Sequence, residues 1–469
     1  MKLKIDLQDI VSWAREYGFI YQSSEIYDGL QAVYDYGHYG CLLKKNIKEL
    51  WWKHMVQYNN DIVGIDSSIL MSPKIWKASG HVDHFDDLMI DNKDSKKRYR
   101  VDMMIEEYSE KLISKGKIEK AQQVLNQMNQ LINDNDLDGL YNLIIDEKIV
   151  CPISGTCNWT NVRHFNLMFN ISDDDVPLYL RPETAQGIYV NFLNIQRSTR
   201  KKIPFGIAQI GKAFRNEIIA RQFTFRMREF EQMEMQFFIK PNEDNEWFEK
   251  WKDTRLKWYD NLGIEKDHLR IKPHDKLAHY AKAAVDIEYL FPFGFKEVEG
   301  IHARGDYDLS CHEKYSGKKL EYFDGETNQN FIPHVIETSA GCDRLTLMVL
   351  SECLIKEKNE DKERLYLNVN KNLAPIKLAI LPLLKKDELI TISKKIYDDL
   401  KIDYQVSYDE NHSIGKRYVR NDLIGTLYCV TIDYDTINDN CVTVRDRNTM
   451  NQERINIDQL KQYFKDNLS

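Results

Sequence analysis

The sequence predicts an α+β protein followed by a smaller α/β unit, and three observations lead to that prediction. Strand-like runs lie on both sides of a charged hairpin between residues 203 and 240. Polar segments with helical spacing fill 94–148 and much of 242–286. The chain after Asn370 alternates between strand and helix patterns. Alternation with period two indicates strands, and spacing near 3.6 residues indicates helices.

Length and composition bound the class of protein. The chain has 469 residues, which is too long for one compact domain. Hydrophobic residues make up 42% and charged residues 29%, so the chain can bury a large core. The net charge is −8, from 65 Lys and Arg against 73 Asp and Glu. A uniformly basic binder is therefore excluded, but a local basic surface for nucleic acid is not.

The apolar stretches and the cysteines indicate the cellular compartment of the protein. The most apolar stretch, Leu373–Leu384, is interrupted by Lys377 and is too short to span a bilayer. Asp6 and Asp9 argue against a signal peptide, because its apolar core would be continuous. The eight cysteines show no framework spacing, which is typical of reduced thiols. We expect a cytoplasmic protein without a transmembrane helix.

The first section contains a predicted helix and a predicted strand. Cys41–Met55 has apolar residues at helical spacing, namely Leu43, Ile47, Leu50 and Trp51. Ile62–Met71 is rich in strand-forming residues and stops at Pro73. The polar helical segment 94–148 then looks like an insertion, with Gly116 and Gly139 as its expected breaks.

The composition changes near Leu373-Ala374-Pro375. We place a domain boundary near Asn370, which divides the chain into a first domain of residues 1–370 and a second of 371–469. The second unit alternates strand and helix in a β-α-β manner over about a hundred residues.

The most informative stretch is Gly211–Phe238. Without a bulge, its second run sends one set of side chains to one face, namely Arg226, Arg228, Phe230, Gln232 and Glu234. Arginine binds phosphate or carboxylate with two hydrogen bonds, and an aromatic ring stacks on a base. This face therefore suits a nucleoside triphosphate beside a small polar substrate. The alternative is an exposed hairpin held by ion pairs.

Two further strings join it. Leu180–Gly187 carries an Arg and a Glu around a proline-stiffened turn, and could also be only a turn. Val335–Leu345 runs from an apolar strand through Glu337, Ser339 and Gly341 into a helical pattern. Small residues before a helix let a ligand approach the backbone, although an ordinary strand-to-helix connection would look similar.

Together these strings resemble the three signature motifs of class II aminoacyl-tRNA synthetases, and among them the homodimeric glycyl-tRNA synthetases. The Cys41–Met55 helix with the run to Pro73 resembles motif 1. Phe214-Arg-Asn-Glu217 and Met227-Arg-Glu-Phe-Glu-Gln-Met-Glu234 resemble motif 2, and Glu337-Thr-Ser-Ala-Gly-Cys-Asp-Arg344 resembles motif 3.

Shorter strings extend the resemblance almost from end to end. They are Trp76-Lys-Ala-Ser-Gly-His81, Arg181-Pro-Glu-Thr-Ala-Gln-Gly187, Phe291-Pro-Phe-Gly294, Arg304-Gly-Asp-Tyr-Asp-Leu309 and, in the tail, Ser413–Tyr418, Tyr428–Thr431 and Val442–Asp446. His38-Tyr39, Ala220 and Thr338 depart from the family pattern, where prolines are usual, but none of these departures removes a charged group.

The resemblance implies a fold and a reaction. The fold is an antiparallel class II sheet flanked by helices, with the helical insertion and a C-terminal α/β anticodon-binding domain. In the reaction, glycine attacks the α-phosphorus of ATP to give glycyl-adenylate and pyrophosphate, and tRNA(Gly) then accepts the glycyl group as AMP is released. Positioning and charge neutralisation dominate such a step.

The resemblance also implies roles for residues. Arg215 would bridge the glycine carboxylate and the α-phosphate, and Glu217 would accept from the adenine amino group. Phe230 and Arg344 would stack on the two faces of adenine, and Glu297 would bind ATP through Mg²⁺. Arg215, Glu217 and Arg344 form the implied catalytic set. The implied ATP-binding set is Arg215, Asn216, Glu217, Phe225, Arg226, Met227, Arg228, Glu229, Phe230, Glu297, Val298, Gly341, Cys342, Asp343 and Arg344.

Glycine has no side chain to recognise, so its site must bind the ammonium and carboxylate and exclude a Cβ atom. By resemblance Glu183, Glu234 and Glu337 with Ser339 would surround the ammonium, and Arg100 and Arg304 would offset their charge. The implied glycine-binding set is Arg100, Glu183, Phe230, Glu231, Gln232, Met233, Glu234, Arg304, Glu337, Thr338, Ser339, Ala340 and Gly341. Any single one of these carboxylates could instead form a structural ion pair.

The remaining expectations concern partners. In the tail Lys416, Arg417 and Arg420 cluster, as do Arg445 and Arg447, and we expect the first cluster to contact the anticodon. A merely solvated face is the alternative. By resemblance the Cys41–Met55 helix would form a homodimer interface. Cys151, Cys157 and His164 lack finger spacing, so no structural zinc is expected.

Two other functions are compatible with parts of the pattern. A synthetase for threonine, proline or histidine would lack the Arg181-Pro-Glu-Thr-Ala-Gln string and the three carboxylates. An inactive relative acting as a nucleic-acid-binding subunit would be expected to lose the ATP-binding arginines, and both Arg215 and Arg344 are present.

Overall fold

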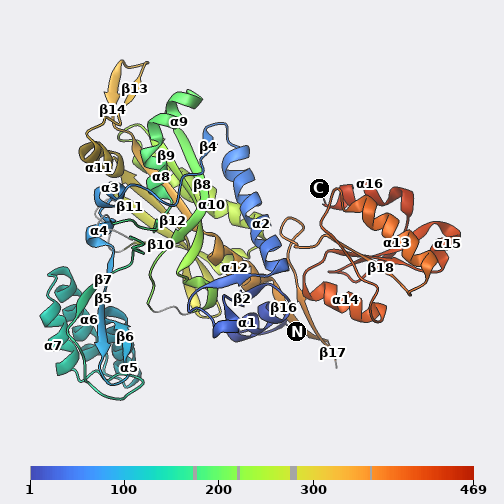
Figure 1. Ribbon diagram of the computed structural model, residues 1–469, viewed down its shortest axis with the longest axis horizontal. Coiled ribbons are helices and arrows are strands. Elements are labelled where there is room, and N and C mark those ends of the chain that lie inside the picture. Colours follow the sequence, from blue (N-terminus) through green and yellow to red (C-terminus); the bar gives the residue numbers. More distant parts are fainter. Residues whose placement is uncertain (1, 173–176, 219–221, 275–281, 360–361, 469) are drawn as a thin grey trace.

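A computed structural model describes the chain except residues 1, 173–176, 219–221, 275–281, 360–361 and 469. A sheet of seven strands forms the centre of the molecule (Figure 1). Its order is β10-β11-β12-β15-β9-β8-β4, and all neighbours are antiparallel except β4 and β8. The bounds are β4 Ile62–Gly64, β8 Phe205–Phe214, β9 Glu229–Ile239, β10 Leu269–Pro273, β11 Ala283–Phe291, β12 Gly294–Gly305 and β15 His334–Gly341.

Helices flank this sheet, as the predicted fold class requires. Their bounds are α1 Leu7–Glu16, α2 His38–Trp52, α3 Pro73–Ala78, α4 His81–His84, α8 Ala185–Val190, α9 Phe192–Thr199, α10 Asp244–Trp258, α11 Tyr307–Ser316 and α12 Cys342–Cys353. Small sheets complete the unit, formed by β1 Lys2–Leu3 with β16 Leu354–Asn359 and β17 Lys362–Leu367, by β2 Ile20–Gln22 with β3 Tyr34–Tyr36, and by β13 Tyr322–Asp324 with β14 Gln329–Phe331. The predicted α+β class is confirmed.

Helix α2 matches the predicted helix but uses its apolar stripe differently. Leu43, Ile47, Leu50 and Trp51 are buried in the main hydrophobic core of the same chain. A π-helical turn, Lys53–Gln57, continues the helix. This stripe is therefore satisfied within one chain, and a subunit interface at this helix would have to use other residues. The predicted run Ile62–Met71 forms a strand only at β4.

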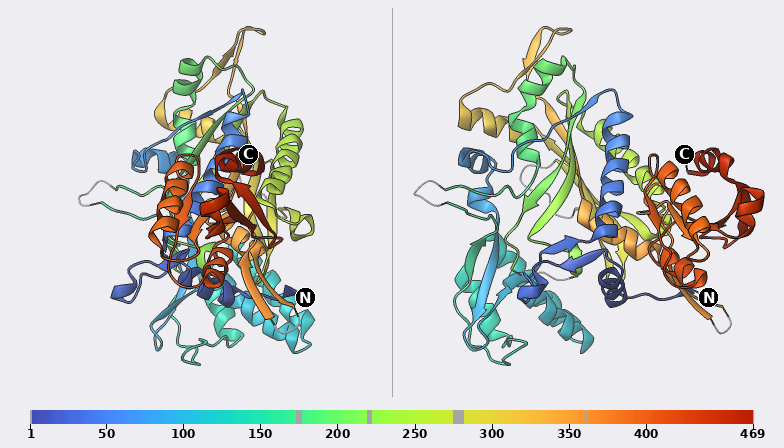
Figure 2. Two further views of the ribbon diagram at one scale, coloured as in Figure 1. Left: turned by 90° about the vertical axis from the view of Figure 1, so that its right-hand side faces the viewer. Right: turned by 45° about the vertical axis from the view of Figure 1, so that its right-hand side comes forward.

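The insertion is a separate layer at one end of the molecule (Figures 1 and 2). Three helices, α5 Val101–Ser114, α6 Ile118–Asn133 and α7 Leu137–Asp146, pack beside the sheet β6-β5-β7, which consists of β5 Asp86–Asn92, β6 Lys97–Arg100 and β7 Arg163–Asn166. Gly116 ends α5 in a left-handed conformation, as predicted. Gly139 does not break a helix: its N–H donates to the side chain of Asp136, the N-cap of α7, at 2.8 Å.

The C-terminal segment lies at the other end and has the predicted β-α-β character (Figures 1 and 2). Its five-stranded sheet has the order β19-β18-β20-β21-β22. The bounds are β18 Leu378–Pro382, α13 Asp387–Leu400, β19 Val406–Tyr408, α14 Ile414–Leu423, β20 Tyr428–Ile432, α15 Asp435–Asp439, β21 Cys441–Asp446, β22 Gln452–Asn456 and α16 Leu460–Leu468. Throughout the described residues, every helix is either too short or too polar to cross a bilayer.

The segment 242–286 differs from the helical prediction. It forms α10 but then the edge strand β10 and the beginning of β11. Strand β10 alternates charged and apolar residues, and its charged Arg270 and Lys272 pair with Glu288 of β11 at 2.6 and 3.6 Å. Charged side chains on an edge strand discourage pairing with another chain. An edge strand can therefore have the same charged composition as an exposed helix, and the sequence pattern did not distinguish the two.

Candidate active site

Strand pairing brings motif 2 and motif 3 together. Strand β9 lies between β8 and β15, and Glu234 pairs in register with Ser339 while Gln236 pairs with Glu337. On the next strand, His302 pairs with Glu337. Since side chains alternate along a strand, the polar ones share one face of the sheet and the apolar ones enter the core behind it. The predicted common face of Phe230, Gln232 and Glu234 is therefore confirmed.

A cavity opens on this face between the β8–β9 hairpin and the start of α12. Its lining combines cations, carboxylates and an aromatic wall, which is the combination that an anionic nucleotide and a small zwitterion require. The lining residues are Arg215, Glu217, Thr224, Phe225, Arg226, Met227, Phe230, Glu231, Gln232, Glu297, Ser339, Gly341, Asp343 and Arg344. Most of the nucleotide-binding residues predicted from the sequence lie in this set.

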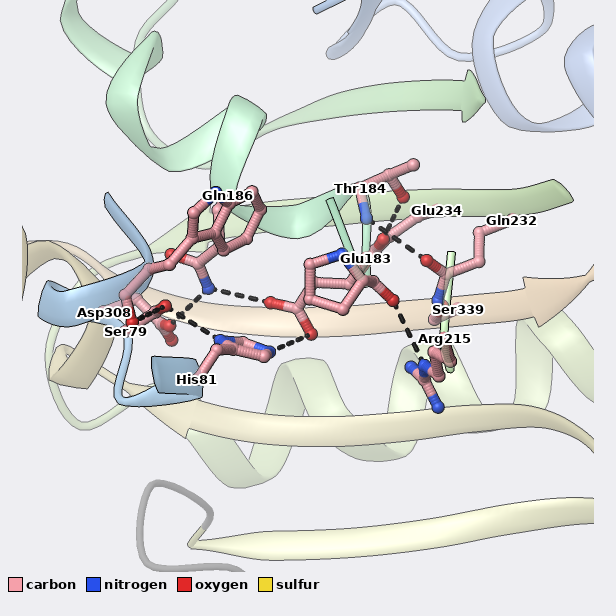
Figure 3. A network of polar contacts seen from close by, with 12 residues as sticks. Ser79, His81, Glu183, Thr184, Gln186, Arg215, Gln232, Glu234, Asp308 and Ser339 are labelled. Atoms are coloured by element: carbon pink, nitrogen blue, oxygen red, sulfur yellow. Dashed lines mark hydrogen bonds and ion pairs between the residues drawn. The ribbon is translucent and has the colours of Figure 1, made fainter. Parts of the chain in front are cut away.

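The side chain of Arg215 is positioned by one backbone carbonyl and by two aromatic rings. Its Nε donates to the carbonyl of Pro182 at 3.1 Å, and its guanidinium lies 5.3 Å from the ring centroids of both Phe85 and Phe230. None of these contacts neutralises its charge. Arg215 therefore brings a cation to the lining of the cavity. Figure 3 draws this side chain and its hydrogen bond.

Arg344 also lines the cavity, beside Glu297, and we call this part of the lining the Arg344 wall. Its Nη1 is 2.9 Å from a carboxylate oxygen of Glu297, and its guanidinium lies 4.4 Å from the ring centroid of Phe225. The charge of Arg344 holds the pKa of Glu297 below its usual range, although burial opposes this shift. The aromatic neighbour of Arg344 is Phe225, whereas Phe230 lies beside Arg215.

Three glutamates and one arginine form a second, more buried layer next to this cavity. Arg304 donates to Glu337 at 2.9 Å and makes two bonds to Asp308, at 2.7 and 3.0 Å. Gln236 donates to both Glu234 and Glu337, at 2.9 and 3.1 Å. Thr184 donates to the other oxygen of Glu234. We name Glu183, Glu234 and Glu337 the carboxylate cage.

The members of the carboxylate cage differ in the direction of their pKa shifts. Burial and the charges of Glu337 and Glu183 raise the pKa of Glu234 well above its usual value. For Glu337 burial acts in the same direction, but Arg304 and His302 outweigh it and lower the pKa to about 2. For Glu183 the charge and hydrogen bond of His81 overcome burial and hold the pKa well below normal. Among the described residues, His81 pairs with Glu183, and His302 and Arg304 pair with Glu337, so the place where a cationic ligand would be favoured is beside Glu234.

Several predicted site residues point elsewhere. The side chains of Met233, Val298, Thr338, Ala340 and Cys342 are buried on the core side of the sheet, so they can offer only backbone groups. Thr338 Oγ1 has no hydrogen-bond partner there. The sequence interpretation included these residues because they stand inside motifs, but alternation places them on the opposite face.

Other predicted residues are engaged with neighbours. Arg228 Nη2 donates to Asn216 at 2.7 Å, outside the cavity. Both Arg226 and Arg228 precede β9, which begins only at Glu229, so the predicted strand from Thr224 is too long. Glu229 pairs with Lys212. The departure noted at Ala220 lies outside the described residues.

Two charged residues connect the cavity to other parts of the molecule. Arg100, on the insertion, pairs with Asp87 at 3.2 Å and Asp102 at 2.6 Å, and Glu217 lies near enough to contribute to its raised pKa. Glu231 faces helix α2, where it pairs with Lys44 at 2.8 Å and Lys48 at 3.0 Å. Sequence reasoning gave no role to Lys44, whose pairing with a distant strand leaves no local pattern.

The predicted anticodon cluster must be corrected at Arg417. This side chain is only 1% exposed and donates to the carbonyls of Pro382, Leu383 and Asp409 at 2.7 to 3.1 Å. Arg417 therefore binds its own domain, whereas Lys416 and Arg420 are exposed. Arg445 and Arg447 are also buried, and Arg445 forms a double ion pair with Asp422.

The cysteines singled out in the sequence have other neighbours. Cys151 Sγ lies 3.3 Å from the Ser95 hydroxyl and 3.2 Å from that of Tyr99. Among the described residues, the groups of three ligand-type side chains close enough for one ion are His274, Asp286 and His302, and Glu265, His268 and Glu352. Neither group contains a cysteine. The expectation of no structural zinc stays a prediction.

Three family models match successive parts of the chain. Residues 87–123 and 114–167 match glycyl-tRNA synthetase insertion domain 1. Residues 168–353 match the class II core domain of tRNA synthetases (G, H, P, S and T), and residues 377–467 match an anticodon binding domain. The three matches correspond to the insertion, the central sheet and the C-terminal sheet described above.

Curated relatives are similar over almost the whole chain. The glycine–tRNA ligase of Chlorobaculum tepidum is 49% identical over 465 residues, which cover 98% of this chain and 99% of that protein. Those of Acetivibrio thermocellus and Staphylococcus haemolyticus are 49% and 47% identical, with 99% and 98% of this chain covered and 99% and 98% of the relatives. With such identity and coverage on a class II core, the chain belongs to the glycine–tRNA ligase family.

Proposed function

We propose that this chain catalyses the reaction for which its family is named, the ATP-dependent attachment of glycine to tRNA(Gly) through glycyl-adenylate. The observation that carries the proposal is the carboxylate cage beside a cavity lined by Arg215 and Arg344. The carboxyl groups of the cage suit the glycine ammonium, and the arginines suit phosphate. Both substrates of the first step would then lie side by side.

Arg215 would hold the two reacting groups together. Its free charge enters the cavity between the cage and the wall of Arg344, where it can contact the glycine carboxylate and the α-phosphate at once. Such a contact lowers the repulsion between two anions and fixes their approach, which are the two effects that dominate phosphoryl-group chemistry. Arg215, Glu217 and Arg344 remain the proposed catalytic set.

The adenine would stack between Arg344 and an aromatic ring. Phe225 is better placed for this than the Phe230 of the sequence interpretation, because Arg344 lies directly over its ring. A separation of 4.4 Å leaves no room for a base, so the base would have to replace this contact. Glu217, whose carboxylate is 3.6 Å from Arg226, would accept from the adenine amino group.

Glu297 fits the role of a metal ligand for ATP. It is the carboxylate on the Arg344 wall of the cavity, and one or two carboxylates with substrate phosphates suffice for Mg²⁺. The Mg²⁺ ion would neutralise the triphosphate charge when ATP binds. Glu297 would exchange its partner Arg344 for this ion, which would free Arg344 for the nucleotide.

The same proposal includes a homodimer in the cytoplasm, where charged tRNA is consumed. Support for self-association comes from the segment Glu25–Leu30, which exposes Ile26 (88%), Tyr27 (80%) and Leu30 (47%). Clustered apolar side chains of this kind mark contact surfaces. Light scattering should give twice the chain mass, and Ile26→Asp with Tyr27→Asp should reduce it. A monomeric starting protein at micromolar concentration would contradict the dimer.

One experiment tests the main proposal. ATP–pyrophosphate exchange is measured with each of the twenty amino acids, and glycine alone should support it. Exchange with threonine, proline or histidine instead would favour the related synthetases. The absence of exchange with every amino acid, together with tRNA binding, would favour an inactive tRNA-binding relative.

A further inference from the structure

Apart from the ring of Phe85 beside Arg215, the segment Trp76–Phe85 has no role in the proposed function, although its sequence string stood out. It leaves α3, turns at Gly80 and enters the single-turn helix α4. Gly80 has φ of +81°, a left-handed conformation that other residues adopt only with strain. This turn directs the ring of His81 back toward the carboxylate cage, as Figure 3 shows.

Four neighbouring side chains hold the ring of His81. Its Nε2 lies 3.3 Å from a carboxylate oxygen of Glu183, and its Nδ1 lies 2.8 Å from the hydroxyl of Ser79. The rings of Trp76 and Phe85 contact it at centroid distances of 5.7 and 5.2 Å. A histidine held between a hydroxyl and a carboxylate has a defined ring orientation, which here places Nε2 next to Glu183.

The second oxygen of Glu183 is bound as well. Gln186 Nε2 donates to it at 2.9 Å, and Gln186 is held in turn by His312 at 2.8 Å and Asp308 at 3.3 Å. Donors on both oxygens fix the plane of the carboxylate. Two donors also favour its ionised form, although the carboxyl group of Glu234 lies nearby.

We propose that His81, held by Ser79, is a positioning residue that keeps Glu183 ionised and aimed at the ammonium group of the substrate glycine. This inference rests on the proposed function. Without the His81 donor, Glu183 could rotate or take up a proton, because neighbouring carboxylates resist sharing negative charge. The cage would then lose a full negative charge at the place where the ammonium binds. ATP would not be affected directly, since His81 is not among the residues lining its cavity.

The test compares His81→Ala with His84→Ala in glycine-dependent pyrophosphate exchange. His84 is an exposed histidine on the same short helix, which makes it a matched control. His81→Ala should raise the glycine KM at least about tenfold, as expected for loss of a hydrogen bond to a charged group, with little change in the ATP KM. His84→Ala should leave both KM values unchanged.

Two more variants separate positioning from folding. Ser79→Ala should raise the glycine KM by a smaller factor, and should add nothing in a His81→Ala background because both act through the same bond. His81→Gln retains an N–H donor and should restore part of the affinity. Should His81→Ala fail to fold, Ser79→Ala and His81→Gln still decide the question.

The outcomes are distinguishable. If the unaltered protein shows no glycine-dependent exchange, the proposed function fails first. If it does exchange, an unchanged glycine KM in folded His81→Ala, or in Ser79→Ala where His81→Ala does not fold, overturns the role of His81. A parallel loss in kcat and in both KM values would indicate general structural damage, and would also overturn it.

Discussion

The pKa values of individual carboxyl groups at this site are shifted in opposite directions by their surroundings. Arg304 and His302 keep Glu337 ionised, whereas Glu234 receives neutral donors from Gln236 and Thr184. Neutral donors cannot offset the repulsion from the other two glutamates. The protein therefore folds with one carboxyl that is protonated more readily than in water, and glycine would supply the missing cation.

Replacing Glu234 with Gln should stabilise the protein while weakening glycine binding. The pKa of Glu234 is raised in the folded state, so folding takes up a proton above the unfolded pKa of about 4.3, and stability falls as pH rises. Glu234→Gln removes this loss. Urea unfolding should show a gain in the free energy of unfolding of the variant over the unaltered protein. This gain should be absent near pH 4 and about 1–3 kcal/mol at pH 8. The glycine KM should rise.

The matched control for this experiment is Glu246→Gln on the exposed face of α10. It makes the same chemical change at an exposed side chain, so the stability difference that it causes should vary little with pH. The pKa pattern inferred for the cage would be contradicted if the stability gain of Glu234→Gln, measured relative to this control, were smaller at pH 8 than at pH 5.

Arg215 tests the other half of the site. Arg215→Ala should lower glycine-dependent pyrophosphate exchange at least about 100-fold, because it removes a preorganised donor aimed at developing charge. Arg197→Ala on the exposed face of α9 is the control and should keep normal exchange. Near-normal exchange by folded Arg215→Ala would remove Arg215 from the catalytic set.

The sequence was informative about residues where alternation decides the outcome. Phe230, Gln232 and Glu234 share a face because the strand has period two, and no three-dimensional knowledge was needed. The sequence was uninformative about Arg417 and Arg447. An arginine that donates to backbone carbonyls of its own domain stands in the same kind of sequence as an arginine that binds RNA. Burial of an arginine depends on the folded surroundings.

At the scale of elements, helix α14 contains both kinds of basic residue. Arg417 faces the domain, and Lys416 next to it is exposed with Arg420 on the same helix. The sequence predicted the helical insertion and the β-α-β tail correctly, since both have sustained patterns. It missed the short strand β10 and misplaced a break at Gly139, because isolated charged or glycine residues do not determine an element by themselves.

Because Lys416 is exposed, we expect Lys416→Glu to weaken RNA binding without lowering the stability of the domain. In tRNA charging it should raise the tRNA KM several-fold and flatten its salt dependence, because fewer counterions are released. Lys465→Glu, an exposed lysine on α16, is the control for charge. If Lys416→Glu and Lys465→Glu give equal KM values across a salt series, the anticodon contact lies elsewhere. Arg417 is unsuitable, because its loss leaves three carbonyls unpaired.

At the scale of the whole molecule, the C-terminal domain is attached to the catalytic unit by specific contacts. Leu423, Ile424 and Leu427 join the main core. Arg447 donates to Gly425 on one side of the boundary and to Val369 on the other, both at 2.7 Å. Amino-acid activation would need only the catalytic unit, whereas charging needs the tRNA to reach both domains at once.

Weakening this attachment should impair charging alone. Arg447→Met retains an apolar stem but loses the bonds across the boundary, so the domain orientation would vary between molecules. We expect pyrophosphate exchange within about twofold of normal and a loss of about tenfold in kcat/KM for tRNA, a cost typical of misplacing a bound substrate. Arg454→Met is the control, since Arg454 pairs with Asp433 and Asp439 inside the tail. If folded Arg447→Met charges tRNA as well as Arg454→Met, the orientation of the C-terminal domain does not depend on this arginine. The other contacts across the boundary, namely the apolar packing of Leu423, Ile424 and Leu427 and the ion pair of Arg364 with Asp422 at 3.0 Å, then set it without Arg447.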